Sequence, residues 1–390
     1  MPVEDFDSVP IVSHMRGALH MSWVDIAADL GWTVRQLERW RERVSFVNPL
    51  QAIDHDEAGD KFLHDLMRAY MIDQPNSGLS TLRGYVRSMG YAVTKQRILD
   101  MMREIDPVGV QQRRPQPKTP RLVYGVRGPL HLVHIDGNAK LIDWFFTIHG
   151  GICGHTHVVV FMEASTNNSA PTVLAKFERG VRRWGIPGRV RLDRGGENYG
   201  IVRRMLREGH NLGLHKPVLL GTSTRNQRIE ALWNHVNHRV TLVYKEFFQQ
   251  LNRTFPDRCP RGHGIRFLLA FLFLDRLNAD LQRWVALWNH HPMSTMRGHS
   301  PLQAMWTNRE LMGNFPATCA DDYGLDDADD EGSNFPQLEL DPLIVPMTRN
   351  QYVLFESKVR RLDLDDDRST WMRHFVYAMN CFDWIKVNIQ

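Results

Sequence analysis

The order of strand-like and helix-like segments across residues 131–288 constrains this chain more than any other feature. Short runs rich in β-branched and aromatic residues predict strands, and longer runs with apolar residues three and four apart predict helices. The predicted strands are 131–136, 142–152, 156–164, 189–193 and 217–220, and the predicted helices are 168–184, 198–208, 223–251 and 265–288. Three consecutive strands followed by alternating helices and strands predict an α/β core with a mixed five-stranded sheet and flanking helices.

The first hundred residues contain two segments with a helix-turn-helix pattern. In the first, Ser22 and Thr33 are suited to cap two helices, with Gly31 in the turn between them. The second repeats the pattern, with Gly90 in the turn and Thr94 as the cap. The basic residues of the second helix in each pair are candidates for DNA contacts, namely Arg35, Arg39 and Arg43 and then Lys95 and Arg97. A helical bundle with solvated charges is the alternative, and two such patterns in tandem favour DNA binding.

Together these patterns divide the chain into six expected parts. They are a helix-turn-helix at 1–52, a second helix-turn-helix-like bundle at 53–105, a Pro/Arg-rich linker at 106–130, the α/β core at 131–310, an acidic linker at 311–336 and a C-terminal extension at 337–390. Because proline disrupts helices, the linker at 106–130 is expected to contain no helix. Its Arg113 and Arg114 are candidates to lie along a phosphate backbone.

The net charge of +4 conceals an uneven distribution of charge. Residues 131–310 hold 24 Lys and Arg against 13 Asp and Glu, whereas residues 311–390 hold 7 against 15. A basic region of this size favours a polyanionic partner, because neutralised phosphates release counterions. A solvated basic surface without a partner is the alternative.

Other functional classes are disfavoured by composition. Residues 267–274 form the longest apolar run, which is too short to span a membrane, so no membrane association is expected. The acidic N-terminus does not resemble a secretory signal. Four cysteines far apart in the sequence indicate a reducing compartment.

Three carboxylates occupy positions where the predicted elements would bring them together. Asp136 and Asp193 each close a predicted strand, and Glu230 lies two turns into a predicted helix. In an RNase H-like sheet, which has this order of elements, the first and fourth strands are neighbours and the helix packs over their edge. Clustered carboxylates repel one another unless cations neutralise them, and oxygen ligands suit Mg²⁺ or Mn²⁺. Two such ions can support an in-line phosphoryl transfer.

The spacing of these residues resembles the D,D(35)E signature of retroviral-type integrases and related transposases, with 36 residues between Asp193 and Glu230. The segments HIDG at 134–137, DRGGEN at 193–198, and WNHHP with GHSPLQAMW at 288–306 are similar to further motifs of that family. The amino-acid sequence of the core, including GGICG and ASTNN, most resembles integrase-core proteins that mobile elements have left in eukaryotic genomes. The likeness covers about 15–310.

This resemblance implies a DDE-type integrase or transposase with Asp136, Asp193 and Glu230 as catalytic and metal-binding residues and with two Mg²⁺ or Mn²⁺ ions. It also implies binding of element-end and target DNA, a homo-multimer that is at least a dimer, and a nuclear location. Arg225 and Arg228, near the helix that carries Glu230, are further candidates for phosphate contacts. The family's N-terminal His-His-Cys-Cys zinc module has no counterpart, so DNA recognition would fall to the helix-turn-helix units. The acidic C-terminal region also departs from the basic barrel of many integrases.

Three alternatives remain open at this level. The chain could be a host-retained copy that binds DNA without catalysis, or an RNase H-like nuclease without joining activity. His155 and His157 offer a minor zinc alternative, although no second ligand pair has suitable spacing.

Overall fold

A computed structural model describes residues 8–74, 77–112, 125–212, 216–221, 226–258, 263–313, 343–363 and 365–389. The chain forms two compact units. One consists of the described parts of 1–124 together with 156–158 and 286–312, and the other of the described parts of 125–155, 159–285 and 313–390. We call them the helical unit and the core unit.

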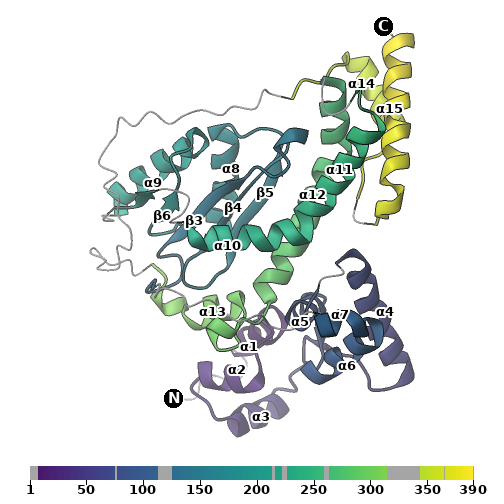
Figure 1. Cartoon of the computed structure of the whole chain (residues 1–390). Coiled ribbons are helices and arrows are strands. Elements are labelled where there is room, and N and C mark those ends of the chain that lie inside the picture. The colour runs from purple at the N-terminus through teal and green to yellow at the C-terminus, as the bar shows by residue number, and fades with distance from the viewer. Residues whose placement is uncertain are drawn as a thin grey trace. The chain divides into compact units, whose positions relative to one another are not determined.

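The core unit is built on a mixed five-stranded sheet (Figure 1). Its strands are β3 (Val133–Asn138), β4 (Thr147–Cys153), β5 (Val159–Ser165), β6 (Val190–Leu192) and β7 (Val218–Leu220). The strand order is β5-β4-β3-β6-β7, in which β3, β4 and β5 pair antiparallel while β6 and β7 run parallel to β3. This arrangement confirms the predicted fold class, a mixed five-stranded sheet with flanking helices behind a helical N-terminal region.

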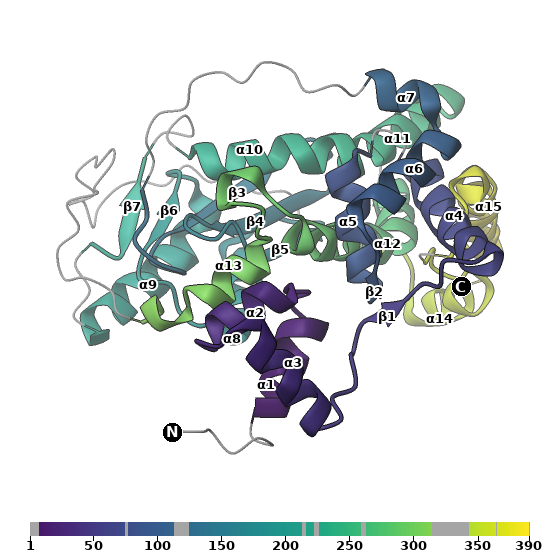
Figure 2. The same cartoon turned by 90° about the horizontal axis from the view of Figure 1, so that it is seen from below.

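Helices cover both faces of this sheet, with α10 on one side and α8 and α9 on the other (Figure 2). The helices of the core unit are α8 (Ala170–Trp184), α9 (Tyr199–Leu212), α10 (Gln227–Val236), α11 (Leu242–Thr254), α12 (His263–His290), α14 (Arg349–Lys358) and α15 (Trp371–Asn388). A π-helical turn, η4 (Asn237–Thr241), joins α10 to α11, so the predicted long helix is continuous but locally widened. The end of α12, from residue 286, belongs to the helical unit.

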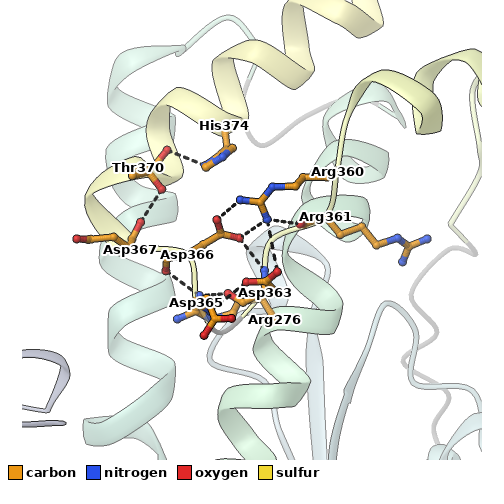
Figure 3. A network of polar contacts seen from close by, with 9 residues as sticks. All are labelled: Arg276, Arg360, Arg361, Asp363, Asp365, Asp366, Asp367, Thr370 and His374. Carbon is orange, nitrogen blue, oxygen red and sulfur yellow. Dashed lines mark hydrogen bonds and ion pairs between the residues drawn. The ribbon is translucent and has the colours of Figure 1, made fainter. Parts of the chain in front are cut away.

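The C-terminal extension packs on α11 and α12 of the core unit. Phe355 of α14 and Trp371 of α15 are fully buried, and Trp371 lies 5.1 Å from the ring of Tyr244. The buried Arg276 of α12 donates to the carbonyl oxygen of Asp366 at 2.9 Å, and Arg360 binds the Asp366 carboxylate (Figure 3). Arg276 also donates to Asp280 at 3.1 Å. Residues 343–389 are therefore an integral part of the core unit.

The helical unit contains two groups of short helices. They are α1 (Ser8–Gly17), α2 (Trp23–Asp29) and α3 (Val34–Arg43), and then α4 (Glu57–Asp73), α5 (Leu79–Ser88), α6 (Lys95–Ile105) and α7 (Pro107–Gln112). The short strands β1 (Gln51–Ala52) and β2 (Tyr91–Ala92) pair in parallel, and α13 (Pro301–Thr307) completes the unit. Ser22, Thr33 and Thr94 cap α2, α3 and α6 as expected, and Gly31 and Gly90 have the positive φ that their turns require.

Two expectations about the linkers need comment. The prediction that 106–130 contains no helix was wrong for its first residues, because Pro107 opens α7. Proline is tolerated in the first turn of a helix, and Asp106 accepts a hydrogen bond from the backbone of Gly109 at 2.9 Å. Residues 113–124 and most of the predicted acidic linker, 314–336, lie outside the described residues.

None of the helices in these described ranges combines the length and the apolar character that a membrane span requires.

Candidate active site

Asp136 lies on β3, the central strand of the sheet, and its side chain is half-buried. One carboxylate oxygen, Oδ2, accepts a hydrogen bond from the indole Nε1 of Trp233 on α10 at 2.8 Å. The indole is itself buried and forms part of the contact between α10 and the sheet. This bond fixes the orientation of the Asp136 carboxylate toward the helix that carries Glu230.

Asp193 follows directly after β6, which neighbours β3 in the sheet. The parallel register pairs Val133 with Val190, and the same offset of 57 residues aligns Asp136 with Asp193. The Asp193 carboxylate accepts a hydrogen bond from Nδ2 of the buried Asn198 at 2.6 Å. The turn after β6 therefore supplies its own support for this carboxylate.

Glu230 lies in the first turn of α10, and its side chain is exposed. The start of this helix is anchored to β3 by Asn226, which is 3 % exposed. Asn226 donates to the carbonyl oxygen of Ile135 at 2.9 Å, and its Oδ1 lies 2.7 Å from Nδ1 of His134. Because a turn of helix separates Asn226 from Glu230, this anchor sets where Glu230 stands along the strand.

Alternate residues of β3 contact α10 and η4 in succession. His134 pairs with Asn226, Asp136 with Trp233, and Asn138 with Asn237 at 2.8 Å. Residues two apart on a strand share one face of the sheet, so these three bonds hold the helix along β3. Gly150 of β4, which pairs with Asp136, makes room for the indole, since a Cβ there would lie 3.0 Å from the Trp233 ring.

The electrostatic environment of Asp136 links the three carboxylates. The pKa of Asp136 is raised from 3.8 to about 7, first by burial and then by the charges of Asp193 and Glu230, while hydrogen bonds from Trp233 and the Gly137 backbone oppose the rise. Asp193 and Glu230 therefore both lie within electrostatic range of Asp136 on β3.

The donor chemistry of this cluster suits a hard divalent cation, because carboxylate oxygens are the ligands that Mg²⁺ and Mn²⁺ prefer. A cation would also relieve the repulsion that raises the pKa of Asp136. In the described ranges, however, no three His, Cys, Asp or Glu side chains are placed so that they could hold a metal ion together. The residues fit the ion chemically, and their side chains would have to converge to bind it.

The predicted DNA-binding residues have different environments. Arg35, Arg39, Arg43 and Lys95 have exposed side chains, and Arg228 is half-buried on α10. Arg97 instead donates to Asp60 at 2.7 Å and to the carbonyl oxygen of Ile53 at 2.6 Å. Arg97 therefore links α6 to α4 and to the segment before it, and its guanidinium is engaged within the helical unit. Arg113, Arg114 and Arg225 lie outside the described residues.

The histidines considered for zinc have other neighbours. Nδ1 of His155 lies 2.6 Å from the carbonyl oxygen of Val126, and Nδ1 of His157 lies 3.4 Å from the sulfur of Met293.

Sequence reasoning missed two residues of the site. Trp233 has the burial of an ordinary core residue, but its indole N–H also orients Asp136. Asn226 directly precedes α10 and is a residue type that favours helix N-termini, which was the available signal for it. Its side chain is directed to β3, however, and the helix start carries no side-chain cap.

Comparison with known proteins identifies the family. A family model described as "Integrase core domain" matches residues 123–318, which is half of the chain. The chain therefore belongs to the integrase core domain family. No curated protein matches the chain.

Two solved structures are similar to this chain. One belongs to the structure of the simian T-cell lymphotropic virus intasome in complex with the PP2A regulatory subunit B56 gamma, with 15 % identity and a TM-score of 0.33 over 65 % of this chain and 78 % of that chain. The other is the HTLV-2 integrase catalytic core domain in complex with magnesium, with 16 % identity and a TM-score of 0.31 over 46 % of this chain and 98 % of that chain.

Proposed function

We propose that this protein is a DDE-type polynucleotidyl transferase that processes and joins DNA. The observation that carries the proposal is geometric: the register of β3 and β6 aligns Asp136 with Asp193, and Asn226 anchors to β3 the helix that carries Glu230, in a core of the integrase family. The pKa of Asp136, raised first by burial and then by the charges of Asp193 and Glu230, supports it. A carboxylate cluster whose members repel one another is suited to bind cations. Perturbed pKa values of this kind concentrate at functional sites.

Asp136, Asp193 and Glu230 would hold two Mg²⁺ or Mn²⁺ ions at this site. When bound, such ions supply a more acidic attacking hydroxyl and stabilise the leaving oxygen of an in-line phosphoryl transfer. The protein's own contribution is positioning: Trp233 orients Asp136, Asn198 orients Asp193, and Asn226 fixes the start of the helix that carries Glu230. Attack by water on a phosphodiester would give end processing, and attack by a DNA 3′-hydroxyl would give strand transfer, with a DNA 3′-oxygen leaving in both reactions.

DNA is the proposed partner, as element ends and as target. Arg35, Arg39 and Arg43 expose basic side chains on α3, with Lys95 on α6 and Arg228 on α10 as further contacts. Joining two ends to a target requires more than one active site, so we infer a homo-multimer that is at least a dimer. Action on chromosomal DNA would place the protein in the nucleus.

The test is a nicking and joining assay with Mn²⁺ and labelled duplexes whose sequences come from the two flanks of the gene, as candidate element ends. We expect both nicked and joined products from the wild-type protein and neither from the folded Asp193→Asn variant. Nicking without joining would favour an RNase H-like nuclease. Binding of the duplex without either product would favour a host-retained DNA-binding protein and would contradict the proposed chemistry.

A further inference from the structure

Three arginines of the helical unit are connected through Arg87, which lies within electrostatic range of the other two and one helical turn after one of them. They are Arg16 on α1 and Arg83 and Arg87 on α5, and each side chain is half-buried. Within the described part of the chain, none of the three forms an ion pair with a carboxylate. Arg16 donates to the carbonyl oxygen of Met21 at 2.7 Å, which fixes part of its guanidinium.

Two histidines line the same place. His20 is 6 % exposed, and its ring lies 4.9 Å from the ring of His290 near the end of α12. Nε2 of His290 lies 3.1 Å from the carbonyl oxygen of Ala18. The site is therefore assembled from α1, from the segment after it, from α5 and from the end of α12, all within the helical unit.

The pKa values of Arg87 and His20 are lowered first by burial and then by neighbouring cations. Burial, Arg83 and Arg16 together lower the pKa of Arg87 to about 10. Burial, His290, Arg87 and Arg16 together lower the pKa of His20 to about 3. His20 is thus neutral at physiological pH, so one of its ring nitrogens remains a hydrogen-bond donor and the other an acceptor.

Asp25 is the carboxylate that attracts Arg87. Its oxygens are already engaged, since Oδ2 accepts from the Ser22 hydroxyl at 2.7 Å and Oδ1 lies 3.6 Å from Nε2 of His299. One partly engaged carboxylate does not balance three arginines.

Several buried polar atoms of this group also lack hydrogen-bond partners among the described residues. They are Nε of Arg16, Nε of Arg83 and Nδ1 of His20. Buried polar atoms in folded proteins are nearly always paired, and an unpaired one is destabilising. Clustered arginines, a nine-tenths-buried histidine and unpaired nitrogens together describe a site that an anion with several acceptor oxygens would complete.

We propose that Arg16, Arg83, Arg87 and His20 form a binding site for a phosphate group. Guanidinium groups match the oxygens of a phosphate in charge and geometry, and two or more of them can bind one phosphate. The group has two possible sources, a phosphodiester of bound DNA or a soluble phosphate. The inference rests on the proposed function only if the phosphate belongs to DNA.

The first experiment measures thermal unfolding of the full chain in chloride and in phosphate or pyrophosphate at matched ionic strength. We expect saturating phosphate to raise the Tm of the wild-type protein by about 4 °C. Arg87→Gln and Arg83→Gln should lose at least half of that rise. Arg68→Gln, which changes an exposed arginine on α4 of the same unit, should keep it.

A second readout separates ligand binding from a merely structural role. In chloride alone the Tm of Arg87→Gln should equal or exceed that of the wild-type protein, because the substitution removes a repelled charge. Should a variant fail to fold, the other arginine variant supplies the same comparison. A phosphate-induced rise that is equal in the wild-type protein and in the folded variants would overturn the proposal, as would no rise in the wild-type protein.

The second experiment identifies the source of the phosphate by titrating duplex DNA at several salt concentrations. If DNA supplies it, Arg87→Gln should weaken binding about fivefold to tenfold and reduce the salt slope by about one, while Arg68→Gln changes neither. If Arg87→Gln loses the phosphate-induced rise in Tm but binds DNA as tightly as the wild-type protein, the site exists and its ligand is a soluble phosphate. If the wild-type protein binds no DNA at all, the proposed function fails while the phosphate response still tests this site.

Discussion

The carboxylate site of the core unit and the arginine cluster of the helical unit both gather like charges, but they are built differently. Asp136 lies within β3, Asp193 directly after β6 and Glu230 in the first turn of α10, and hydrogen bonds from Trp233 and Asn198 orient the two aspartates. The arginine cluster includes polar atoms that lack hydrogen-bond partners in the part of the chain that the structure describes, and its members come from segments far apart in the sequence. The comparison shows that mutual repulsion alone does not reveal a site's chemistry: the sign of the charge indicates the ligand, and the supporting bonds indicate how accurately that ligand must be placed.

The largest effect should come from removing a carboxylate of the core site. Asp193→Asn removes one negative charge with little change in shape, and we expect the rate of DNA nicking to fall by at least about a hundredfold, as for other groups that stabilise transition-state charge. The single-turnover rate with Mn²⁺ measures this. Asp143→Asn changes an exposed aspartate of the same unit and is the matched control. If the nicking rate of Asp193→Asn changed only slightly, the carboxylate cluster would have a structural role and not a catalytic one.

A paired arginine provides the contrast to the arginine cluster. Arg276 is 2 % exposed and donates to Asp280 and to the carbonyl oxygen of Asp366. Arg276→Gln should lower the free energy of unfolding by about 3 kcal/mol, because it breaks a buried network that anchors the C-terminal extension. Denaturant unfolding measures the difference. If Arg276→Gln were as stable as the wild-type protein, the carboxylate-paired Arg276 would not differ in stability from the arginines of the cluster, and the comparison would fail.

The repulsion at Asp136 should appear as a pH dependence of stability. Since folding raises the pKa of this group from 3.8 to about 7, the folded state binds its proton more tightly, and stability falls as the pH rises from about 4 to about 7. Asp136→Asn keeps an acceptor for Trp233 and removes the charge. At pH 8 without divalent ions it should raise the free energy of unfolding by about 1–2 kcal/mol, after allowance for partial exposure, and it should have little effect at pH 4. Thermal unfolding across this pH range checks the sign, and a loss of stability at pH 8 would contradict it.

The smallest effect should come from Trp233→Phe, which keeps a ring against Gly150 and removes the donor to Asp136. Because that bond lowers the pKa of Asp136, its loss should raise the pKa further and shift the pH–rate profile to higher pH. We expect the rate to fall about threefold to tenfold at pH 7 and to recover at pH 9, consistent with the loss of one hydrogen bond. A uniform loss at every pH would indicate a packing defect instead.

The sequence predicted the core because its signals are local. Alternating strands and helices specify the sheet, and Asp193 directly follows β6 as predicted, whereas β3 continues for two residues beyond Asp136, which was expected to close it. The supporting bonds could not be predicted, since the contact between Trp233 and Asp136 joins residues 97 apart. For the same reason the sequence could not show that Arg97 bonds to Asp60 and Ile53, since these contacts depend on how α6 packs in the helical unit.

The arginine cluster could not be predicted from the sequence at all. Arg16 precedes the first helix-turn-helix pattern, and Arg83 and Arg87 lie in the first helix of the second pattern. The sequence pattern instead assigned DNA contacts to the second helix of each pair. No spacing rule connects these positions with His290, more than two hundred residues later. Their proximity follows from tertiary packing of the helical unit and is evident only in three dimensions.

Cation binding tests the central claim most directly, namely that Asp136, Asp193 and Glu230 form one metal-binding site. Calorimetric titration with Mn²⁺ at pH 8 should show saturable binding to the wild-type protein and to the control variants Asp143→Asn and Glu246→Gln. Asp136→Asn, Asp193→Asn and Glu230→Gln should each weaken the affinity at least about tenfold, and wild-type binding should weaken as the pH falls below about 7, where Asp136 becomes protonated. Unchanged Mn²⁺ affinity in all three variants would contradict the account.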